Sequence, residues 1–248
     1  MSKKFIPLLI STLPIFCLCS CSGDSSKKIV LAKNSDEIYS QSEHTYRAID
    51  LEEISANHKL GVGFAIYLST EGCSECLNFT PIMESYLQST NLLTYHFDID
   101  NNLNELRELN KIYNHQLFTH SENDSIYVTA PSVYLVNGDN INKVSNDSYM
   151  KTKAAFNNYL NSRYQVKDVY TFKGKIDCPT NFVNVTFNYD NADLLSLYTK
   201  LVLPAFKEST NKIIVSNNPD IDALTITKDG QNYPINSETD PSLIKSLL

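Results

Sequence analysis

The 248-residue sequence predicts an α/β protein in which a mixed sheet is flanked by helices and is followed by a smaller C-terminal α/β domain. Two observations lead to this prediction. Short apolar runs alternate with segments of helical periodicity between residues 46 and 165. A second alternation of the same kind starts after residue 165 and continues to residue 248. We therefore predict two folded units, 46–165 and 166–248.

Residues 1–20 have the pattern of a secretory signal peptide, with two early lysines followed by an apolar segment over residues 5–18. That segment is short and contains two prolines, which argues against a membrane span. It ends in Leu18-Cys19-Ser20-Cys21, which resembles the lipobox of bacterial lipoproteins. The resemblance implies cleavage before Cys21 and lipidation of that residue. The alternatives are an ordinary signal peptide with incidental cysteines and an uncleaved anchor.

Residues 21–45 are rich in serine, lysine and aspartate and show no clear period, so we predict a tether. One apolar patch within them, Ile29–Ala32, has the composition of a short strand. Acyl chains on Cys21 would hold the protein at the outer face of the plasma membrane.

The formal net charge is −7, and the loss of Lys3 and Lys4 with the signal makes it more negative by two. An acidic protein is a poor partner for nucleic acid or for anionic lipid headgroups, so we expect no nucleic acid partner. The hydrophobic fraction of 42% is sufficient to fill a core. We therefore expect an ordered, exported protein whose membrane attachment depends on the lipid.

The first predicted unit begins with a short helix, because Asp50 is a good cap residue placed before Leu51-Glu52-Glu53-Ile54. A continuous apolar run over 62–68 predicts a buried strand, and apolar residues at helical spacing over 77–87 predict a long helix. The same signals predict a strand at 94–99, an amphipathic helix at 103–113, a polar loop at 115–124, a strand at 130–136, a hairpin at Asn137-Gly138, an edge strand at 143–144 and a helix at 151–164.

The second predicted unit contains fewer elements. A strand over 184–189 precedes a helix over 193–208 that Pro204 interrupts. The remaining elements are a strand at 213–215, a hairpin formed by 224–227 and 233–235 around Asp229-Gly230, and a last helix from Asp240-Pro241 to Leu247.

The tetrapeptide Cys73-Ser74-Glu75-Cys76 lies where the predicted buried strand is followed by the first long helix. Free amides and the positive dipole end at a helix start favour an anion, so Cys73 is expected to ionise readily. A thiolate attacks disulfides, and a second thiol two residues further on resolves the mixed disulfide that forms. The motif therefore predicts Cys73 and Cys76 as the catalytic pair of a redox-active disulfide.

Three features together resemble the thioredoxin superfamily over residues 46–165. These are the CxxC at a helix start, Pro81 five residues after its second cysteine, and Ala130-Pro131 at the opening of a strand before a hairpin. The resemblance implies that Pro81 kinks the helix. It also implies that Pro131 follows a cis peptide and, with Ala130, shapes the substrate groove. Residues 166–248 are then either a second, degenerate thioredoxin-like unit or a small α/β appendage.

Other interpretations of these residues remain open at this stage. The CxxC is compatible with a structural disulfide or with half of a metal site, although the other cysteines and histidines show no zinc spacing, and we predict no metal. Pro131 could follow a trans bond, as most prolines do. Cys178 is left without a partner if Cys21 is lipidated, which makes it either a reactive thiol or a small buried hydrophobic residue.

The sequence also departs from thioredoxins at residues that tune the motif. Gly72 and Ser74 replace the family's aromatic and glycine residues, and Glu75 places a carboxylate inside the motif. Tyr67 occupies the position of the family's buried aspartate. A nearby carboxylate opposes thiolate formation at Cys73, so we expect a reducing rather than a strongly oxidising pair.

The sequence therefore predicts a membrane-anchored extracytoplasmic thiol-disulfide oxidoreductase. It would act on thiols and disulfides of exported proteins and exchange electrons with a membrane thiol-electron carrier. The redox-active Cys73–Cys76 disulfide would be its whole redox apparatus, with no further cofactor. The competing hypothesis is a surface lipoprotein that acts as a binding module in transport or bacteriocin processing, with a permanent Cys73–Cys76 disulfide.

Overall fold

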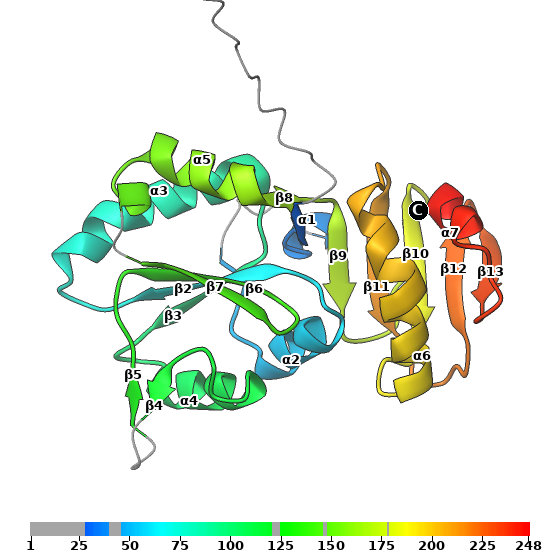
Figure 1. Cartoon of the computed structure of the whole chain (residues 1–248), viewed down its shortest axis with the longest axis horizontal. Helices are drawn as coiled ribbons and strands as arrows, with labels where there is room; N and C mark the ends of the chain where they lie inside the picture. Colours follow the sequence, from blue (N-terminus) through cyan, green and yellow to red (C-terminus); the bar gives the residue numbers. More distant parts are fainter. Residues whose placement is uncertain (1–27, 40–45, 121–124, 146–147, 178) are drawn as a thin grey trace, which may run out of the picture.

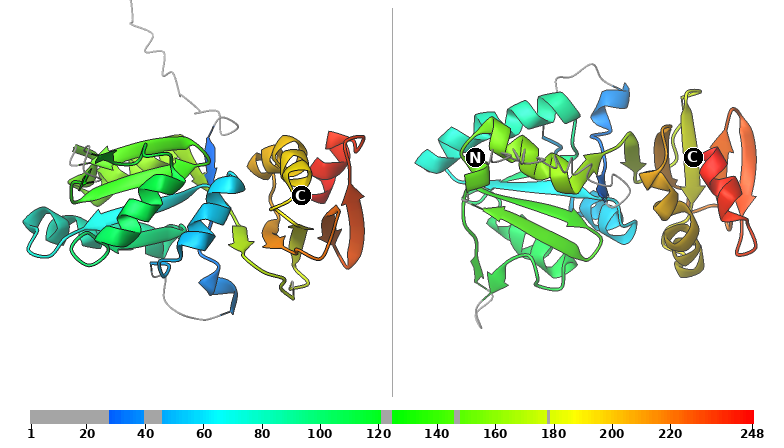
Figure 2. Two further views of the ribbon diagram at one scale, coloured as in Figure 1. Left: turned by 90° about the horizontal axis from the view of Figure 1, so that it is seen from below. Right: turned by 45° about the horizontal axis from the view of Figure 1, so that its top comes forward.

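The structure, a computed structural model, describes residues 28–39, 46–120, 125–145, 148–177 and 179–248. The predicted signal peptide, Cys21 and Cys178 lie outside these ranges. Within them the chain forms two units that lie side by side, each built on its own sheet (Figures 1 and 2). No helix in these ranges combines the length and the apolar character needed to cross a membrane.

The first unit contains a four-stranded sheet in the order β3-β2-β6-β7. Strand β2 is parallel to β3 and antiparallel to β6, and β7 is antiparallel to β6. This order and these directions are those of the thioredoxin fold, as the sequence predicted. The strands are β2 (Phe64–Ser69), β3 (Thr94–Asp98), β6 (Ser132–Asn137) and β7 (Asn140–Ser145).

Helices cover both faces of this sheet (Figure 1). On one face, α3 (Ser74–Thr90) packs against α5 (Lys153–Arg163), and their apolar side chains meet those of β2 in a core that includes Tyr67, Phe79 and Phe156. On the other face, α2 (Leu51–Lys59) packs against α4 (Leu103–Ile112).

The caps and short connections of the first unit explain where its helices begin. Asp50 caps α2 by accepting hydrogen bonds from the amides of Glu52 and Glu53, as predicted. The predicted polar loop over 115–124 differs from expectation, because it contributes a strand to a small hairpin. That hairpin and a short helical turn complete the unit: β4 (Thr119–His120), β5 (Ile126–Tyr127) and a 3₁₀ turn, η2 (Ser148–Met150).

The described part of the predicted tether is packed structure and not a free linker. The expected short strand is present as β1 (Ile29–Leu31), which pairs in parallel with β8 (Tyr164–Val166), and the short helix α1 (Asp36–Tyr39) follows. Ala32 is fully buried and donates its amide to the carbonyl of Gly63. A side chain at Gly63 would come within 2.5 Å of a β1 carbonyl, so this close approach requires glycine.

The second unit contains a five-stranded sheet in the order β13-β12-β10-β11-β9. Strand β10 is parallel to β11 and antiparallel to β12, and β13 is antiparallel to β12. The order β11-β10-β12-β13 and its strand directions therefore repeat those of β3-β2-β6-β7 in the first unit. The second unit thus has the topology of a second, degenerate thioredoxin-like unit. The strands are β9 (Val169–Phe172), β10 (Phe182–Phe187), β11 (Lys212–Asn217), β12 (Leu224–Lys228) and β13 (Gln231–Ile235).

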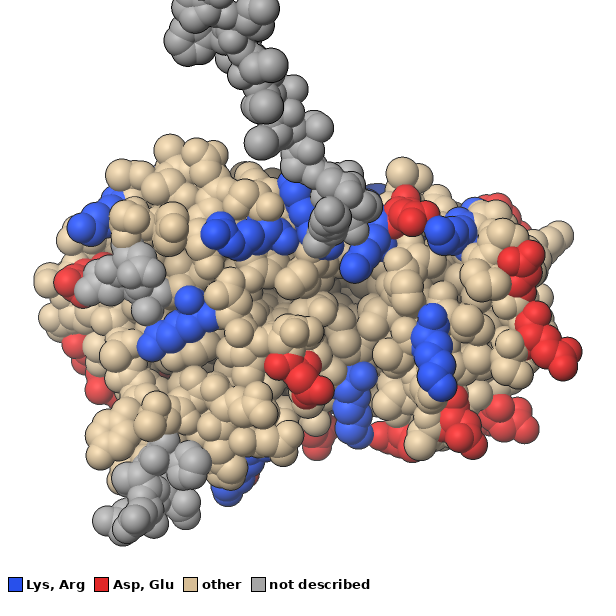
Figure 3. Space-filling model, viewed as in Figure 1, with Lys and Arg blue, Asp and Glu red and all other residues tan. Residues whose placement is uncertain are grey.

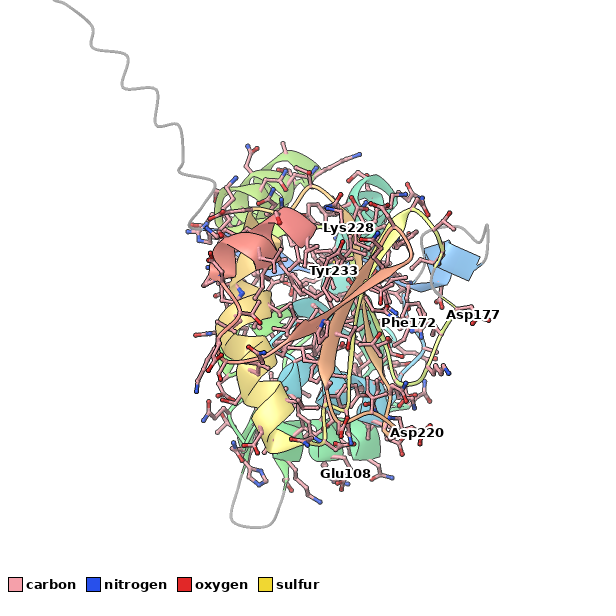
Figure 4. All side chains as sticks on the ribbon, turned by 90° about the vertical axis from the view of Figure 1, so that its right-hand side faces the viewer. Glu108, Phe172, Asp177, Asp220, Lys228 and Tyr233 are labelled. Carbon is pink, nitrogen blue, oxygen red and sulfur yellow. A yellow bond between two sulfur atoms is a disulfide. The ribbon has the colours of Figure 1, made fainter. Side chains whose placement is uncertain are left out.

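The helix predicted over 193–208, with an interruption at Pro204, consists of three consecutive helical pieces in the structure. These are α6 (Ala192–Leu197), a π-helical turn η3 (Tyr198–Val202) and a 3₁₀ turn η4 (Leu203–Lys207) that contains Pro204 near its start. The final helix α7 (Pro241–Leu247) begins at the predicted cap, Asp240. Figure 4 shows Lys228 beside α7, where its ammonium group donates to the carbonyl of Ser246.

Apolar packing and ion pairs join the two units. One core cluster runs from the α2–α4 face of the first sheet into the second unit, where it includes Phe187 and Phe206. Lys59 pairs with Asp190 at 3.0 Å, and Lys173 pairs with Asp50 at 2.6 Å. On the face shown in Figure 3, basic residues are spread over both units, whereas many of the acidic residues lie over the second unit.

Candidate thiol-disulfide site

The CxxC lies at the carboxyl end of β2, where the chain turns into α3. Cys73 is the N-cap of α3, and its sulfur accepts a hydrogen bond from the amide of Cys76 at 3.0 Å. The two cysteines form a disulfide, with their Cα atoms 5.2 Å apart. The structure thus places the pair at the helix start that the sequence predicted.

The two sulfur-bearing residues differ in accessibility. Cys73 is half-buried, whereas only 4% of Cys76 is exposed. Gly72, Ser74 and Glu75 are exposed around them. An incoming thiol or disulfide therefore reaches Cys73 more easily, which suits Cys73 for attack and Cys76 for resolution.

The loop before Cys73 is held by a residue that the sequence analysis did not single out. Asp100, which follows β3, accepts hydrogen bonds from the hydroxyl of Thr70 at 2.5 Å and from the amide of Glu71 at 3.1 Å. This contact ties the CxxC loop to the neighbouring strand. A loop aspartate is common in sequences, and only the pairing of β2 with β3 shows which amide it meets.

Pro131 lies directly beside the disulfide. The Ala130–Pro131 peptide is cis, as the resemblance implied, and Pro131 is buried. The carbonyl oxygen of Ala130 lies 3.8 Å from the Cys73 sulfur. The two predicted groove residues are therefore brought to Cys73 from a different part of the chain.

A cavity of about 430 Å³ opens next to Pro131. Its apolar wall consists of Phe79, Pro131 and Met150, and polar groups stand at its edge. A polypeptide whose cysteine is bonded to Cys73 would have this space for a neighbouring side chain. The residues that line it are Glu75, Asn78, Phe79, Pro131, Met150 and Lys151.

Tyr67 lies on β2, six residues before Cys73. It is fully buried, and its hydroxyl is 2.8 Å from the Thr80 hydroxyl. Its ring stacks on His96 at 4.8 Å, and Tyr46 lies next to both rings. Burial raises the pKa of Tyr67, so its hydroxyl stays protonated at neutral pH.

The remaining predicted residues have different positions. Pro81 lies inside α3 as expected, and the helix continues beyond it to Thr90. Cys21 and Cys178 are outside the described residues, so their predicted roles stay predictions. Within the described ranges, no group of three or more His, Cys, Asp or Glu side chains is arranged to hold a metal ion.

No family model and no curated protein matches the sequence. Similar solved structures include a mutant thioredoxin from Halobacterium salinarum, at 13% identity and a TM-score of 0.35, covering 51% of this chain and 96% of that chain. Thioredoxin O2 from Arabidopsis thaliana in the oxidized state has 13% identity and a TM-score of 0.34, covering 51% and 100%. Human ERp44 form I has 9% identity and a TM-score of 0.36, covering 84% of this chain and 56% of that chain.

Because these similarities are so low, the class of the protein rests on its own topology and site. The β3-β2-β6-β7 order, the CxxC disulfide at the start of α3 and the cis-proline loop beside it define a thioredoxin-like protein.

Proposed function

We propose that this protein is a thiol-disulfide oxidoreductase that reduces disulfides of exported proteins through Cys73 and Cys76. The observation that carries the proposal is the difference in burial within the disulfide: Cys73 is partly accessible, next to the Ala130-Pro131 loop, whereas Cys76 is buried. A permanent structural disulfide has no need for an accessible sulfur next to a cavity.

The reaction follows from this arrangement. In the reduced protein, the Cys73 thiolate, favoured by the start of α3, attacks one sulfur of a substrate disulfide. A Cys73–substrate bond forms as the substrate disulfide breaks, and one substrate thiolate leaves. The Cys76 thiolate then attacks the Cys73 sulfur, forming Cys73–Cys76 and releasing the second substrate thiolate. Two electrons have passed to the substrate, and an external dithiol must return them.

The direction of transfer is proposed from the charges around the motif. Glu71 and Glu75 are negatively charged neighbours of Cys73, and they disfavour its thiolate. Their exposure weakens the effect, because water and salt screen it. Tyr67 replaces the buried carboxylate of the family with a neutral hydroxyl. A pair whose reduced thiolate is not strongly stabilised is a reductant rather than a strong oxidant.

The location and the partners are part of the same proposal. If Cys21 is lipidated, the disulfide lies at the outer face of the plasma membrane, where no cytoplasmic reductant reaches it. The dithiol that regenerates Cys73 and Cys76 would then be a membrane thiol-electron carrier. We expect neither a metal nor a further cofactor.

A trapping experiment tests the chemistry. The Cys76→Ala variant should accumulate mixed disulfides at Cys73 in cells, whereas Cys73→Ala with Cys76 intact should not. Nonreducing electrophoresis followed by mass mapping identifies the bond. Absence of adducts in Cys76→Ala, with a wild-type disulfide that exchanges with dithiols only after denaturation, would overturn the proposal. The protein would then be a binding module with a structural disulfide.

A further inference from the structure

A chain of two hydrogen bonds leads from the central strand to the buried cysteine. The hydroxyl of Thr80 donates to the carbonyl oxygen of Cys76 at 2.9 Å. The single hydroxyl proton of Thr80 is used in this bond, so in its other contact, the Thr80 oxygen accepts. Tyr67 is therefore the donor in the 2.8 Å bond to Thr80.

The ring of Tyr67 is held firmly by its neighbours. It is fully buried, stacks on His96 at an interplanar angle of 16°, and meets the edge of Phe79 at 5.6 Å. A buried ring held on several sides loses little further freedom when its hydroxyl makes a bond. The hydroxyl is thus directed at Thr80 by packing and not only by the bond itself.

The backbone around Cys76 has fewer ordinary helical hydrogen bonds than the middle of a regular helix. Its amide is engaged by the Cys73 sulfur. One residue further on, the carbonyl of Leu77 cannot receive the usual helical bond, because its donor would be the nitrogen of Pro81. The helix is therefore one bond short just after the cysteine. The side-chain bond from Thr80 contacts the Cys76 carbonyl at this point in the helix.

We propose that Tyr67 is a positioning residue for the disulfide and that it acts through Thr80 on the backbone of Cys76. By holding that backbone, the two hydroxyls keep the Cys76 sulfur within reach of Cys73 and raise its effective concentration toward it. Tyr67 thus gives the site a fixed neutral donor where the sequence lacks a buried acid. The proposal deepens the proposed function and rests on it for its role in turnover.

The test measures the equilibrium between the Cys73–Cys76 disulfide and reduced glutathione, with the thiols counted by mass-tag alkylation. Tyr67→Phe removes the hydrogen bond from Tyr67 to Thr80. Thr80→Val removes the hydrogen bond from Thr80 to the Cys76 carbonyl. We expect each variant to lower the effective concentration of the pair about tenfold, which corresponds to a potential about 30 mV less negative. The double variant should lose no more than either single variant, because both bonds belong to one chain.

Two matched controls separate positioning from general damage. Tyr46→Phe removes a neighbouring buried hydroxyl that has no hydrogen-bond partner among the described residues, and the equilibrium should stay as in the wild type. Thr80→Ser keeps the hydroxyl and should also stay close to the wild type. Thermal unfolding of the oxidised forms reports whether each variant folds.

An unchanged equilibrium in Tyr67→Phe would overturn the proposal, and so would an equal loss in Tyr46→Phe. Additive losses in the double variant would show that the two residues act separately, and this also contradicts it. If Thr80→Val failed to fold, the glutathione equilibria of Thr80→Ser, Tyr67→Phe and Tyr46→Phe would still test the positioning role. These measurements use the purified protein alone, so their failure is distinguishable from a failure to trap substrates with Cys76→Ala.

Discussion

The two units of this protein use the same backbone at the same place but different side chains. In the first unit, Ser69 ends β2 and the cap of α3 follows four residues later at Cys73. In the second, Phe187 ends β10 and the cap of α6 follows four residues later at Asn191. The two caps have almost the same conformation, with φ and ψ of −79° and 107° at Cys73 and −79° and 112° at Asn191.

The two caps share a backbone conformation but carry different side chains, an amide at Asn191 and a sulfur at Cys73. The amide oxygen of Asn191 accepts from the amides of Asp193 and Leu194, which is a good helix cap. The sulfur of Cys73 accepts from the amide of Cys76, and sulfur is a weak acceptor. The fold thus supplies a helix start with free amides in both units. Only one of them holds a nucleophile there.

The residues around the two helix caps also differ. When the two sheets are aligned by strand register, Val185 of β10 occupies the position of Tyr67 in β2. Tyr198 follows Asn191 at the same distance in sequence as Thr80 follows Cys73, and its buried hydroxyl has no hydrogen-bond partner among the described residues. Leu224 occupies the place of cis-Pro131. The second unit therefore keeps the sheet but has none of the parts that surround the disulfide.

Cysteines placed at the cap of α6 test whether the two helix starts are equivalent. In a background without Cys73 and Cys76, Asn191→Cys/Leu194→Cys should form a disulfide on mild oxidation, because the backbone at Asn191 matches that at Cys73. Asn191→Cys/Leu195→Cys, with one extra residue between the thiols, should form it far less completely. Peptide mapping after alkylation measures both. Free thiols in the first variant would mean that the caps are not equivalent.

Core truncation tests whether the units differ in their link to the disulfide. Phe156→Ala and Phe187→Ala should each cost about 3–5 kcal/mol in urea unfolding, since both rings are fully buried. Only Phe156 touches a ring of α3, Phe79, at 5.1 Å. We therefore expect Phe156→Ala alone to change the glutathione equilibrium. An equal change in Phe187→Ala would show that the second unit also controls the site.

The ion pairs between the units should contribute much less. Lys59→Met removes the pair with Asp190, and because both side chains are largely exposed we expect a loss of at most about 1 kcal/mol. The loss should disappear in 1 M salt, where charges are screened within about 3 Å. Urea unfolding at low and high salt measures it, with Lys200→Met, on an exposed lysine, as control. A loss that persists at high salt would contradict this.

The smallest effect concerns His96, whose counterpart in the second unit is Val215. Burial lowers the pKa of His96, and Asp98 acts against this. The unfolded chain therefore binds a proton at higher pH than the folded one, so stability is complete above about pH 6.5 and falls as the pH decreases further. The free energy of unfolding should differ less between pH 7.5 and pH 5.5 in His96→Gln than in the wild type. An unchanged difference would contradict this assignment.

Much of the first unit was predictable because its signals are local. The apolar run ending at Leu68, the cap at Asp50 and the CxxC before a periodic segment each depend on neighbours in sequence. In the second unit, Asp229-Gly230 turns between β12 and β13 as predicted, since both residues adopt positive φ. The strands that escaped prediction were β4, β5, β8 and β9. Of these, β8 and β9 are paired in parallel with strands distant in sequence.

The same distinction between local and long-range features applies to the thiol-disulfide site. The amino-acid sequence alone identified the residues of the site: two cysteines at a helix start, a proline opening a strand, and a tyrosine in place of an acid. The packing of distant elements was needed to show which sulfur is more accessible, that Asp100 holds the CxxC loop, and that Thr80 links Tyr67 to Cys76. Helix caps and apolar periods act between neighbouring residues, whereas burial and side-chain hydrogen bonds depend on how distant elements pack.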